Sequence, residues 1–365
     1  MLNLRKISYR LAVYFWCLAV IAWMGTSIAN ASTWYSAGSV YLGANATQVM
    51  ADPNRPYVYA IDRINNKILF INTTTKTVTK RLYVGKDPTD FDIDASGNYL
   101  YVGHKGSGSG APGSFKIGTV NLNTQTKTGD FTIPVEYHNS SLLRAVNVTA
   151  GRQGRLYYNA GYDLWNGGSG HAVNTDTWTD LGSFAGVKSP MVISSDKSRL
   201  YGQYIYSGNL GEMGVWDVST DSINRVDQLR FSPYPYGWDY DNYSLSGNDQ
   251  YLAYGNVLFD AGNLLNQYGV FPENIYQLSF DGSIAFGNTS IWDTTTFLTE
   301  GDATWLQDMP VHTTIMDFDA QSNTLYSFNP SDQRLYMVVV PEPSTLLLLG
   351  SGLLGIIMRK RRRIA

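Results

Sequence analysis

The sequence predicts an all-β fold, a seven-bladed β-propeller with four-stranded blades, at residues 32–340. Three observations predict it. A hairpin signature occurs seven times, the copies follow one another with a period of about 44 residues, which suits a four-stranded blade, and no stretch between residues 32 and 340 has sustained helical periodicity. A signal peptide is predicted before this domain, and a C-terminal transmembrane segment after it.

The repeated unit is an apolar strand, a turn of small polar residues, and a second strand that begins with an apolar residue and tyrosine. Its clearest copies are residues 93–102 and 193–201. Other copies lie at residues 50–59, 148–157 and 318–326, with weaker ones at 245–253 and 280–285. Asp, Ser, Gly and Asn favour tight turns and Asx-type hydrogen bonds, and alternating apolar positions favour half-buried strands. We therefore expect each copy to form a hairpin.

A second signature follows the hairpins: an apolar strand that ends in Asp or Asn and then Thr or Ser, as in residues 68–75 and 291–296. Two segments, Leu100-Tyr101-Val102-Gly103 and Ile71-Asn72-Thr73-Thr74-Thr75, resemble the YVTN-type repeats of seven-bladed propellers in surface and secreted proteins. The resemblance spans nearly all of residues 32–340 and is best in blades one, two, four and seven. Blade five, around residues 238–260, and blade six depart from the pattern.

The ends of the domain predict how the ring closes. Residues 40–43 resemble residues 82–85, the end of a fourth strand, yet they precede the first complete blade. The last blade ends at residues 335–340 without a fourth strand of its own. We expect the N-terminal segment to complete that blade and remove an exposed sheet edge. The alternative is a loose N-terminal arm.

The C-terminal segment, residues 341–365, has the composition of a sorting signal. A Pro-Glu-Pro box is followed by an apolar run at residues 346–358 and a basic cluster; these parts comprise Pro341, Glu342, Pro343, Ser344, Arg359, Lys360, Arg361, Arg362 and Arg363. The prolines keep the box extended, and the basic cluster is expected to stay cytoplasmic. The apolar run is shorter than the roughly 17 to 25 residues of an ordinary membrane span.

This order of parts resembles the PEP-CTERM signal. The resemblance implies processing by an exosortase in a Gram-negative bacterium, with transient anchoring in the inner membrane. The final location is then the cell surface, the outer membrane or the extracellular matrix. An ordinary C-terminal membrane anchor is the alternative.

The N-terminal segment, residues 1–31, is predicted to be a signal peptide. Arg5, Lys6 and Arg10 precede an apolar stretch at residues 11–24, and Ala29 and Ala31 are the small residues that a signal peptidase reads. A retained N-terminal anchor is the alternative.

Without the two terminal segments the chain is acidic, with 19 Lys and Arg against 29 Asp and Glu, a net charge of minus ten. This balance disfavours nucleic-acid binding. The single cysteine, Cys17, lies in the predicted signal peptide, so residues 32–340 have neither a disulfide nor a thiolate metal site.

Candidate catalytic residues are sparse, and we predict no catalytic residue and no cofactor. The four histidines have no metal-ligand spacing and are expected at the surface or in loops, and no nucleophile elbow or phosphate-binding loop occurs. Polar groups at the predicted starts of innermost strands are Asp87, Arg144, Glu273 and His312. Calcium is an alternative, because Asp87 and the alternating carboxylates of Asp90, Asp92 and Asp94 offer hard oxygen ligands.

Two loops are candidates for ligand binding. In the propeller, residues 103–114 and 161–170 each connect a second to a third strand, so both open on one face together with residues 86–88. Tyr162, Trp165 and Asn166, with Asp87, are the candidate contacts. Most aromatic residues are expected in the packing between blades, including the equivalent tyrosines Tyr101, Tyr157, Tyr201 and Tyr326.

Two functional hypotheses follow. The first is an exported, non-enzymatic propeller that binds an exopolysaccharide or a surface protein, or serves as a scaffold. The second is a propeller enzyme, either a lactonase-like hydrolase or a quinone-dependent dehydrogenase. Fold alone does not choose between them.

Overall fold

The computed structural model describes residues 35–105, 115–134, 146–160, 169–185, 187–205, 211–230, 243–295, 304–309 and 313–340. The chain divides into two compact units, Gly38–Met337 and the remainder, Met1–Ala37 with Val338–Ala365. The unit Gly38–Met337 contains nearly all of the propeller. Its described residues form strands, turns and bends, with no helix among them.

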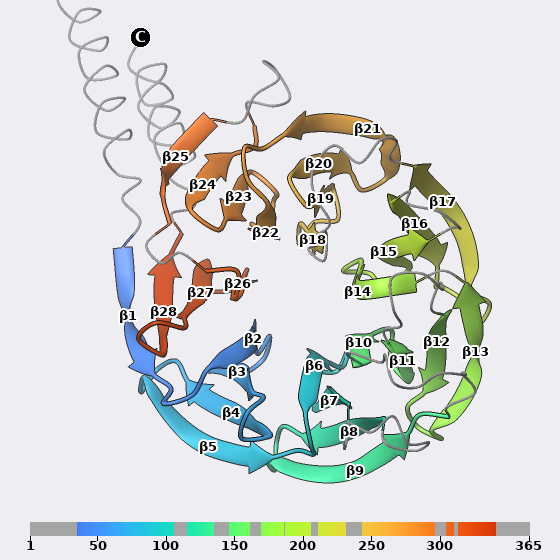
Figure 1. Cartoon of the computed structure of the whole chain (residues 1–365), viewed down its shortest axis with the longest axis horizontal. Helices are drawn as coiled ribbons and strands as arrows, with labels where there is room; N and C mark the ends of the chain where they lie inside the picture. The colour runs from blue at the N-terminus through green and yellow to red at the C-terminus, as the bar shows by residue number, and fades with distance from the viewer. Residues whose placement is uncertain are drawn as a thin grey trace, which may run out of the picture. The chain divides into compact units, whose positions relative to one another are not determined.

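The strands form seven four-stranded sheets around a common centre (Figure 1). Blade one contains β2 (Ala46–Ala51), β3 (Tyr57–Asp62), β4 (Lys67–Asn72) and β5 (Thr77–Tyr83). Blade two contains β6 (Pro88–Ile93), β7 (Tyr99–His104), β8 (Lys116–Asn121) and β9 (Thr126–Thr132). Blade three contains β10 (Val146–Ala150), β11 (Arg155–Ala160), β12 (Ser169–Asn174) and β13 (Thr179–Ala185). Blade four contains β14 (Val187–Ile193), β15 (Arg199–Ile205), β16 (Gly211–Asp217) and β17 (Asn224–Arg230).

The remaining blades follow the same order. Blade five contains β18 (Tyr243–Leu245), β19 (Tyr251–Tyr254), β20 (Val257–Asp260) and β21 (Asn263–Val270). Blade six contains β22 (Ile275–Leu278), β23 (Ile284–Gly287), β24 (Ser290–Asp293) and β25 (Thr304–Asp308). Blade seven contains β26 (Met316–Asp319), β27 (Thr324–Asn329), β28 (Arg334–Val339) and, as its outer strand, β1 (Tyr35–Tyr41). The seven-bladed, four-stranded prediction is confirmed.

Consecutive blades contact each other through their innermost strands all the way round. Each innermost strand from β2 to β22 contacts the innermost strand of the next blade, and β26 returns to β2. The hydrophobic core lies between the blades. Tyr59 and Phe70 of blade one, for example, share a buried cluster with Phe91 and Leu100 of blade two.

The inner hairpins are held by the polar turns that the repeat predicts. Asp94 accepts hydrogen bonds from the backbone N–H groups of Asn98 and Tyr99, both at 2.7 Å. A serine hydroxyl does the same in later blades: Ser194 accepts from Arg199 at 2.8 Å, and Ser246 accepts from Tyr251 at 2.9 Å. Each such bond ties the start of the second strand to the end of the first.

The equivalent tyrosines of the second strands are buried as predicted. Tyr157 and Tyr201 are each 1% exposed, and Tyr101 and Tyr326 are each 5% exposed. The Tyr201 hydroxyl donates to the Ala261 carbonyl of the next blade at 3.0 Å. These rings therefore act as wedges between blades, and the polar tip of Tyr201 finds a partner in the next blade.

The outer strands carry β-bulges. Six blades show a register shift where the outer strand pairs with the third strand, as between Phe70 and Ile71 in blade one. A bulge raises the local twist and interrupts the regular ladder, so it makes the outer edge a poor template for another strand.

The ring closes through the N-terminal strand, as predicted, and the loose-arm alternative is wrong. β1 pairs with β28, and the Leu42 N–H donates to the Gln333 carbonyl at 2.8 Å. The strand begins at Tyr35, earlier than residues 40–43, the segment that the repeat identifies.

The closing strand should make a large contribution to stability. Leu42, the residue directly after β1, is fully buried, so Leu42→Ala should lower the free energy of unfolding by about 2–5 kcal/mol. Denaturant unfolding measures this. Thr132→Ala on the exposed edge of β9 is the control and should change stability by less than about 0.5 kcal/mol. Equal stability of the two variants would contradict closure by this segment.

Candidate functional site

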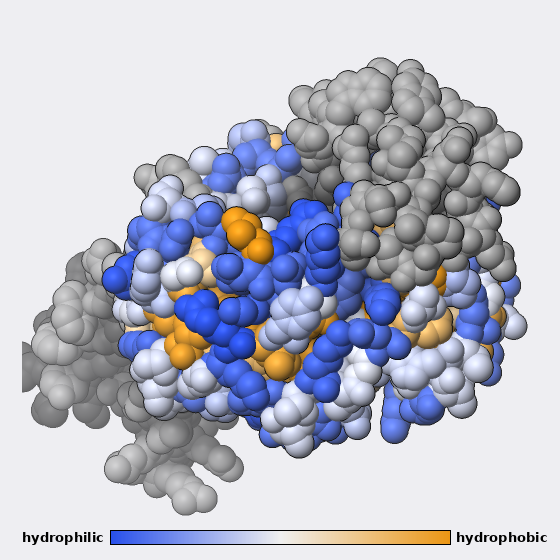
Figure 2. Space-filling view, turned by 60° about the horizontal axis from the view of Figure 1, so that its bottom comes forward, coloured by the Kyte–Doolittle hydropathy of each residue, from blue (hydrophilic) through white to orange (hydrophobic). Residues whose placement is uncertain are grey.

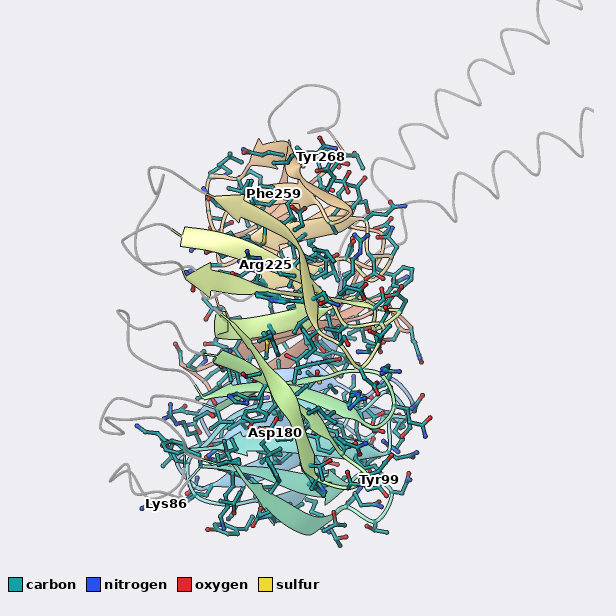
Figure 3. The ribbon with its side chains drawn as sticks, turned by 90° about the vertical axis from the view of Figure 1, so that its right-hand side faces the viewer. Lys86, Tyr99, Asp180, Arg225, Phe259 and Tyr268 are labelled. Carbon is teal, nitrogen blue, oxygen red and sulfur yellow. The ribbon has the colours of Figure 1, made fainter. Side chains whose placement is uncertain are left out.

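The propeller has two faces with different connections. One, here called the loop face, carries the connections into the innermost strands and those between second and third strands. The other, the turn face, carries the inner-hairpin turns. In Figure 3, Lys86 on the loop face and Tyr99 beside an inner-hairpin turn lie on opposite sides of blade two. The two predicted ligand loops lie between β7 and β8 and between β11 and β12, as predicted, and most of their residues lie outside the described ones.

Asp87 is the only predicted ligand-contact residue among the described ones. Its carboxylate forms an ion pair with the Arg63 guanidinium at 2.5 Å, and its N–H donates to the Asn66 side chain at 2.7 Å. Its carbonyl accepts the Lys105 N–H at 3.0 Å. The residue has a φ of 55°, a left-handed conformation that these bonds hold in place. Tyr162, Trp165 and Asn166 lie outside the described residues.

The carboxylates of β6 join blade two to blade three. Asp90 accepts the Val148 N–H at 2.8 Å, and Asp92 accepts the Ala150 N–H at 2.7 Å. Both donors belong to β10, the innermost strand of the next blade. The same contact occurs where the ring closes, because Asp317 of β26 accepts the Ala51 N–H of β2 at 2.7 Å.

Neutral side chains make comparable contacts elsewhere in the ring. Gln48 of blade one both donates to the Phe91 carbonyl and accepts its N–H, each at 3.1 Å. Ser244 of blade five accepts the Leu278 N–H of blade six at 2.8 Å. We call these side-chain-to-backbone bonds between innermost strands the inter-blade latches. They satisfy backbone groups that face another sheet and have no ladder partner there.

Burial perturbs the latch carboxylates. Desolvation raises the pKa of Asp90 to about 7, although the hydrogen bond from Val148 opposes this. Desolvation likewise raises the pKa of Asp317 to about 6 and raises the pKa of Asp92. The charged form is disfavoured because removal from water outweighs the bonds that a carboxylate accepts.

The four carboxylates of the calcium alternative do not converge. Asp87 faces Arg63, Asp90 and Asp92 bond to the backbone of blade three, and Asp94 caps its own turn. Alternation puts side chains on one face of a strand, but the neighbouring blade supplies their partners. In the part of the chain that the structure describes, no group of three His, Cys, Asp or Glu side chains is placed to hold a metal ion.

The other polar groups at strand starts are likewise dispersed. The Glu273 carboxylate accepts the Thr289 N–H at 2.8 Å and the Trp292 indole N–H at 3.0 Å. It therefore braces the connection between the second and third strands of blade six. Arg144 and His312 lie outside the described residues.

His104 is a feature that sequence reasoning missed, because it was expected at the surface or in a loop. The residue ends β7 and is 2% exposed. Within the described residues, neither ring nitrogen has a hydrogen-bond partner. Burial, more than any nearby charge, lowers the pKa of His104 to about 4. A Cβ on Gly118 would lie 2.7 Å from its Nε2 and one on Gly85 3.0 Å from its Cε1, so two glycines make room for the ring.

The C-terminal segment supplies the clearest functional signal. β28 ends at Val339, and Val340 is 4% exposed. The family of the PEP-CTERM protein-sorting motif matches residues 339–363. The chain carries a PEP-CTERM sorting motif. The motif implies export and membrane-associated sorting by an exosortase.

The motif begins where the last strand ends, so no separate linker intervenes in the sequence. The individual residues predicted for sorting and cleavage, from Pro341 to Arg363 and Ala29 with Ala31, lie outside the described residues. Among the described residues, no helix is long and apolar enough to cross a membrane.

Solved structures match the fold over most of the chain. Kuenenia stuttgartiensis hydrazine synthase matches with a TM-score of 0.59 and 13% identity, over 81% of this chain and 96% of that one. U3-55K matches with a TM-score of 0.61 and 12% identity, over 85% and 100%. The Cps50 (Swd1) β-propeller domain of Myceliophteria thermophila matches with a TM-score of 0.59 and 10% identity, over 84% and 100%. Identities this low show the fold alone. No curated protein matches the chain.

The latch carboxylates should make stability depend on pH. Between about pH 4 and 7 the folded state holds a proton on Asp90 that the unfolded state releases, so the free energy of unfolding should fall as pH rises through this range. Asp90→Asn keeps an oxygen acceptor for Val148 without a charge. It should reduce this slope, by up to about 1.4 kcal/mol per pH unit, in denaturant unfolding at a series of pH values.

Asp90→Ala separates charge from hydrogen bonding. It also removes the titration, but it leaves the Val148 N–H without its acceptor. It should therefore be less stable than Asp90→Asn at every pH by about 1–3 kcal/mol. A slope in Asp90→Asn equal to that of the unsubstituted protein would contradict the assignment.

Proposed function

We propose that this protein is a non-enzymatic binding propeller of the bacterial cell surface or extracellular matrix, and that its ligand is a surface polysaccharide. The observation that carries the proposal is the sorting motif directly after the last strand of a propeller. A chain so organised delivers one folded module to the envelope. The propeller fold fits a binding or scaffold module.

The use of the polar groups supports binding over catalysis. Asp87, Asp90, Asp92 and Glu273 are the acids that a site at the starts of innermost strands would use. Each instead bonds to an arginine, a backbone N–H or an indole of the fold. A catalytic acid or base must reach a substrate proton, whereas these carboxylates hold neighbouring segments together.

Processing at the sorting motif can be tested directly. Glu342→Ala changes the box but keeps the apolar run and the basic cluster, so a longer, membrane-bound form should accumulate. Deletion of residues 341–365 should instead release the protein to the medium without a membrane-held precursor, because the last strand is complete by then. Mass spectrometry of the C-terminal peptide distinguishes these results. Mature protein that still ends at Ala365 would show that the segment is a plain anchor.

The binding function requires a screen of the exported protein. We expect retention on one or more bacterial polysaccharides in a glycan array, no stoichiometric metal by elemental analysis, and no turnover of lactones. Turnover together with a stoichiometric ion would favour the enzyme hypothesis. Capture of a surface protein, with no glycan retained, would replace the polysaccharide by a protein ligand.

A further inference from the structure

Two exposed tyrosines break the repeat at one place in the ring. Tyr41 ends β1, the outer strand of blade seven, and Tyr83 ends β5, the outer strand of blade one; they are 59% and 58% exposed. Outer strands of the other blades end in Thr132, Ala185, Arg230, Val270 and Asp308. Most tyrosines of the repeat are wedges between blades. These two instead display their rings to solvent on neighbouring blades.

Arginine side chains lie beside these rings. The Arg334 guanidinium carbon is 5.9 Å from the centroid of the Tyr41 ring, within the range of a cation–π contact. On the other side of the seam, Arg81 donates to the Leu42 carbonyl. A Cβ on Gly43 would lie 3.5 Å from Tyr41 Cε1 and 3.6 Å from an Arg81 nitrogen, so both side chains border the same glycine.

Strand register connects Tyr83 to the same surface. Arg81 and Tyr83 are two residues apart on β5 and therefore point to the same side, and both are exposed. Lys67 is the cross-strand partner of Tyr83. We call Tyr41, Arg81, Tyr83 and Arg334 the seam row, because they lie where blade seven meets blade one.

Two members of the seam row, Tyr41 and Arg334, are anchored in the fold. The Tyr41 hydroxyl donates to Gln333 Oε1 at 3.4 Å, and Arg334 donates to the Ser39 hydroxyl at 3.1 Å. Anchored rings and guanidinium groups lose less conformational freedom when they bind a ligand.

Charge distribution favours an anionic partner here. Residues 46–134, blades one and two, contain 10 Lys and Arg against 7 Asp and Glu. Residues 243–340 contain 11 Asp and Glu, and their one basic residue is Arg334 of the seam row. In a domain with a net charge of minus ten, the local excess of positive charge therefore lies on blades one and two, and Arg334 extends it across the seam onto blade seven. The face in Figure 2 is mostly hydrophilic, and outside the grey atoms its hydrophobic patches are small and separate.

We infer that the seam row is a binding site for a carboxylated polysaccharide. This rests on the proposed polysaccharide-binding function and names its location and ligand class. The flat faces of Tyr41 and Tyr83 suit the C–H face of a sugar ring, and the arginine forks suit carboxylates bidentately. A chain of uronic acids presents both features at regular intervals.

The test uses the exported protein with polygalacturonate as the probe and dextran as the neutral control. Polygalacturonate should bind with an affinity that falls as salt rises, and dextran should not bind. Tyr83→Ala should weaken binding about tenfold, because one stacking ring is lost, whereas Tyr83→Phe should stay within about twofold because it keeps the ring. The matched control is Tyr99→Ala, which alters an exposed tyrosine beside an inner-hairpin turn on the turn face (Figure 3). This variant should bind polygalacturonate like the unsubstituted protein.

Each of the other possible results would contradict a different part of this inference or of the proposed function. Unchanged polygalacturonate binding in Tyr83→Ala would place the site elsewhere and leave the proposed function intact. Equal binding of dextran would contradict the anionic ligand class. Binding of no polysaccharide, in the probe pair or the array, would contradict the proposed function itself. Loss of self-association in Tyr83→Ala, with polygalacturonate binding retained, would make the seam row a contact between copies of this chain.

Discussion

The inter-blade latches are the constraint on which the ring depends. A propeller leaves the backbone of each innermost strand facing another sheet, where no ladder partner exists. Asp90 and Asp92 supply acceptors for β10, and Asp317 supplies one for β2 where the ring closes. An unsatisfied buried N–H costs about 1–3 kcal/mol, so each latch also fixes the position of one blade against the next.

The latches have an electrostatic cost. Carboxylates held between blades are partly removed from water, and the pKa of Asp90 rises to about 7 and that of Asp317 to about 6. Gln48 and Ser244 make similar bonds without a charge. Charged latches thus join blade two to blade three and blade seven to blade one, whereas neutral ones join blade one to blade two and blade five to blade six. This concentrates the pH dependence of the ring at a few contacts.

Repetition also separates structural residues from functional ones. A buried tyrosine such as Tyr201 fills a place that most blades share, and packing explains it. Tyr41 and Tyr83 share an outer position that the other blades fill with other residues, and they are exposed side by side with arginines. A departure from the repeat that costs burial without improving packing is a reasonable place to seek a ligand.

The sequence by itself determined the elements that depend on local chemistry. Polar turns such as the one at Asp94 indicated the hairpins, and the period of the hairpin signature indicated the number of blades. The likeness of residues 40–43 to residues 82–85 predicted the closing strand, although it did not predict that the strand begins at Tyr35. The sorting motif could be identified from the sequence because its Pro-Glu-Pro box, apolar run and basic cluster follow one another directly in the chain.

Tertiary structure decided everything that depends on a neighbouring blade. Alternation placed Asp90 and Asp92 on one face of β6 but did not reveal that β10 lies against that face, so an ion site and a latch could not be told apart. Burial of His104 depends on Gly85 and Gly118, one from the preceding connection and one from the next strand. The seam row joins residues near both ends of the propeller, which meet only because the ring closes.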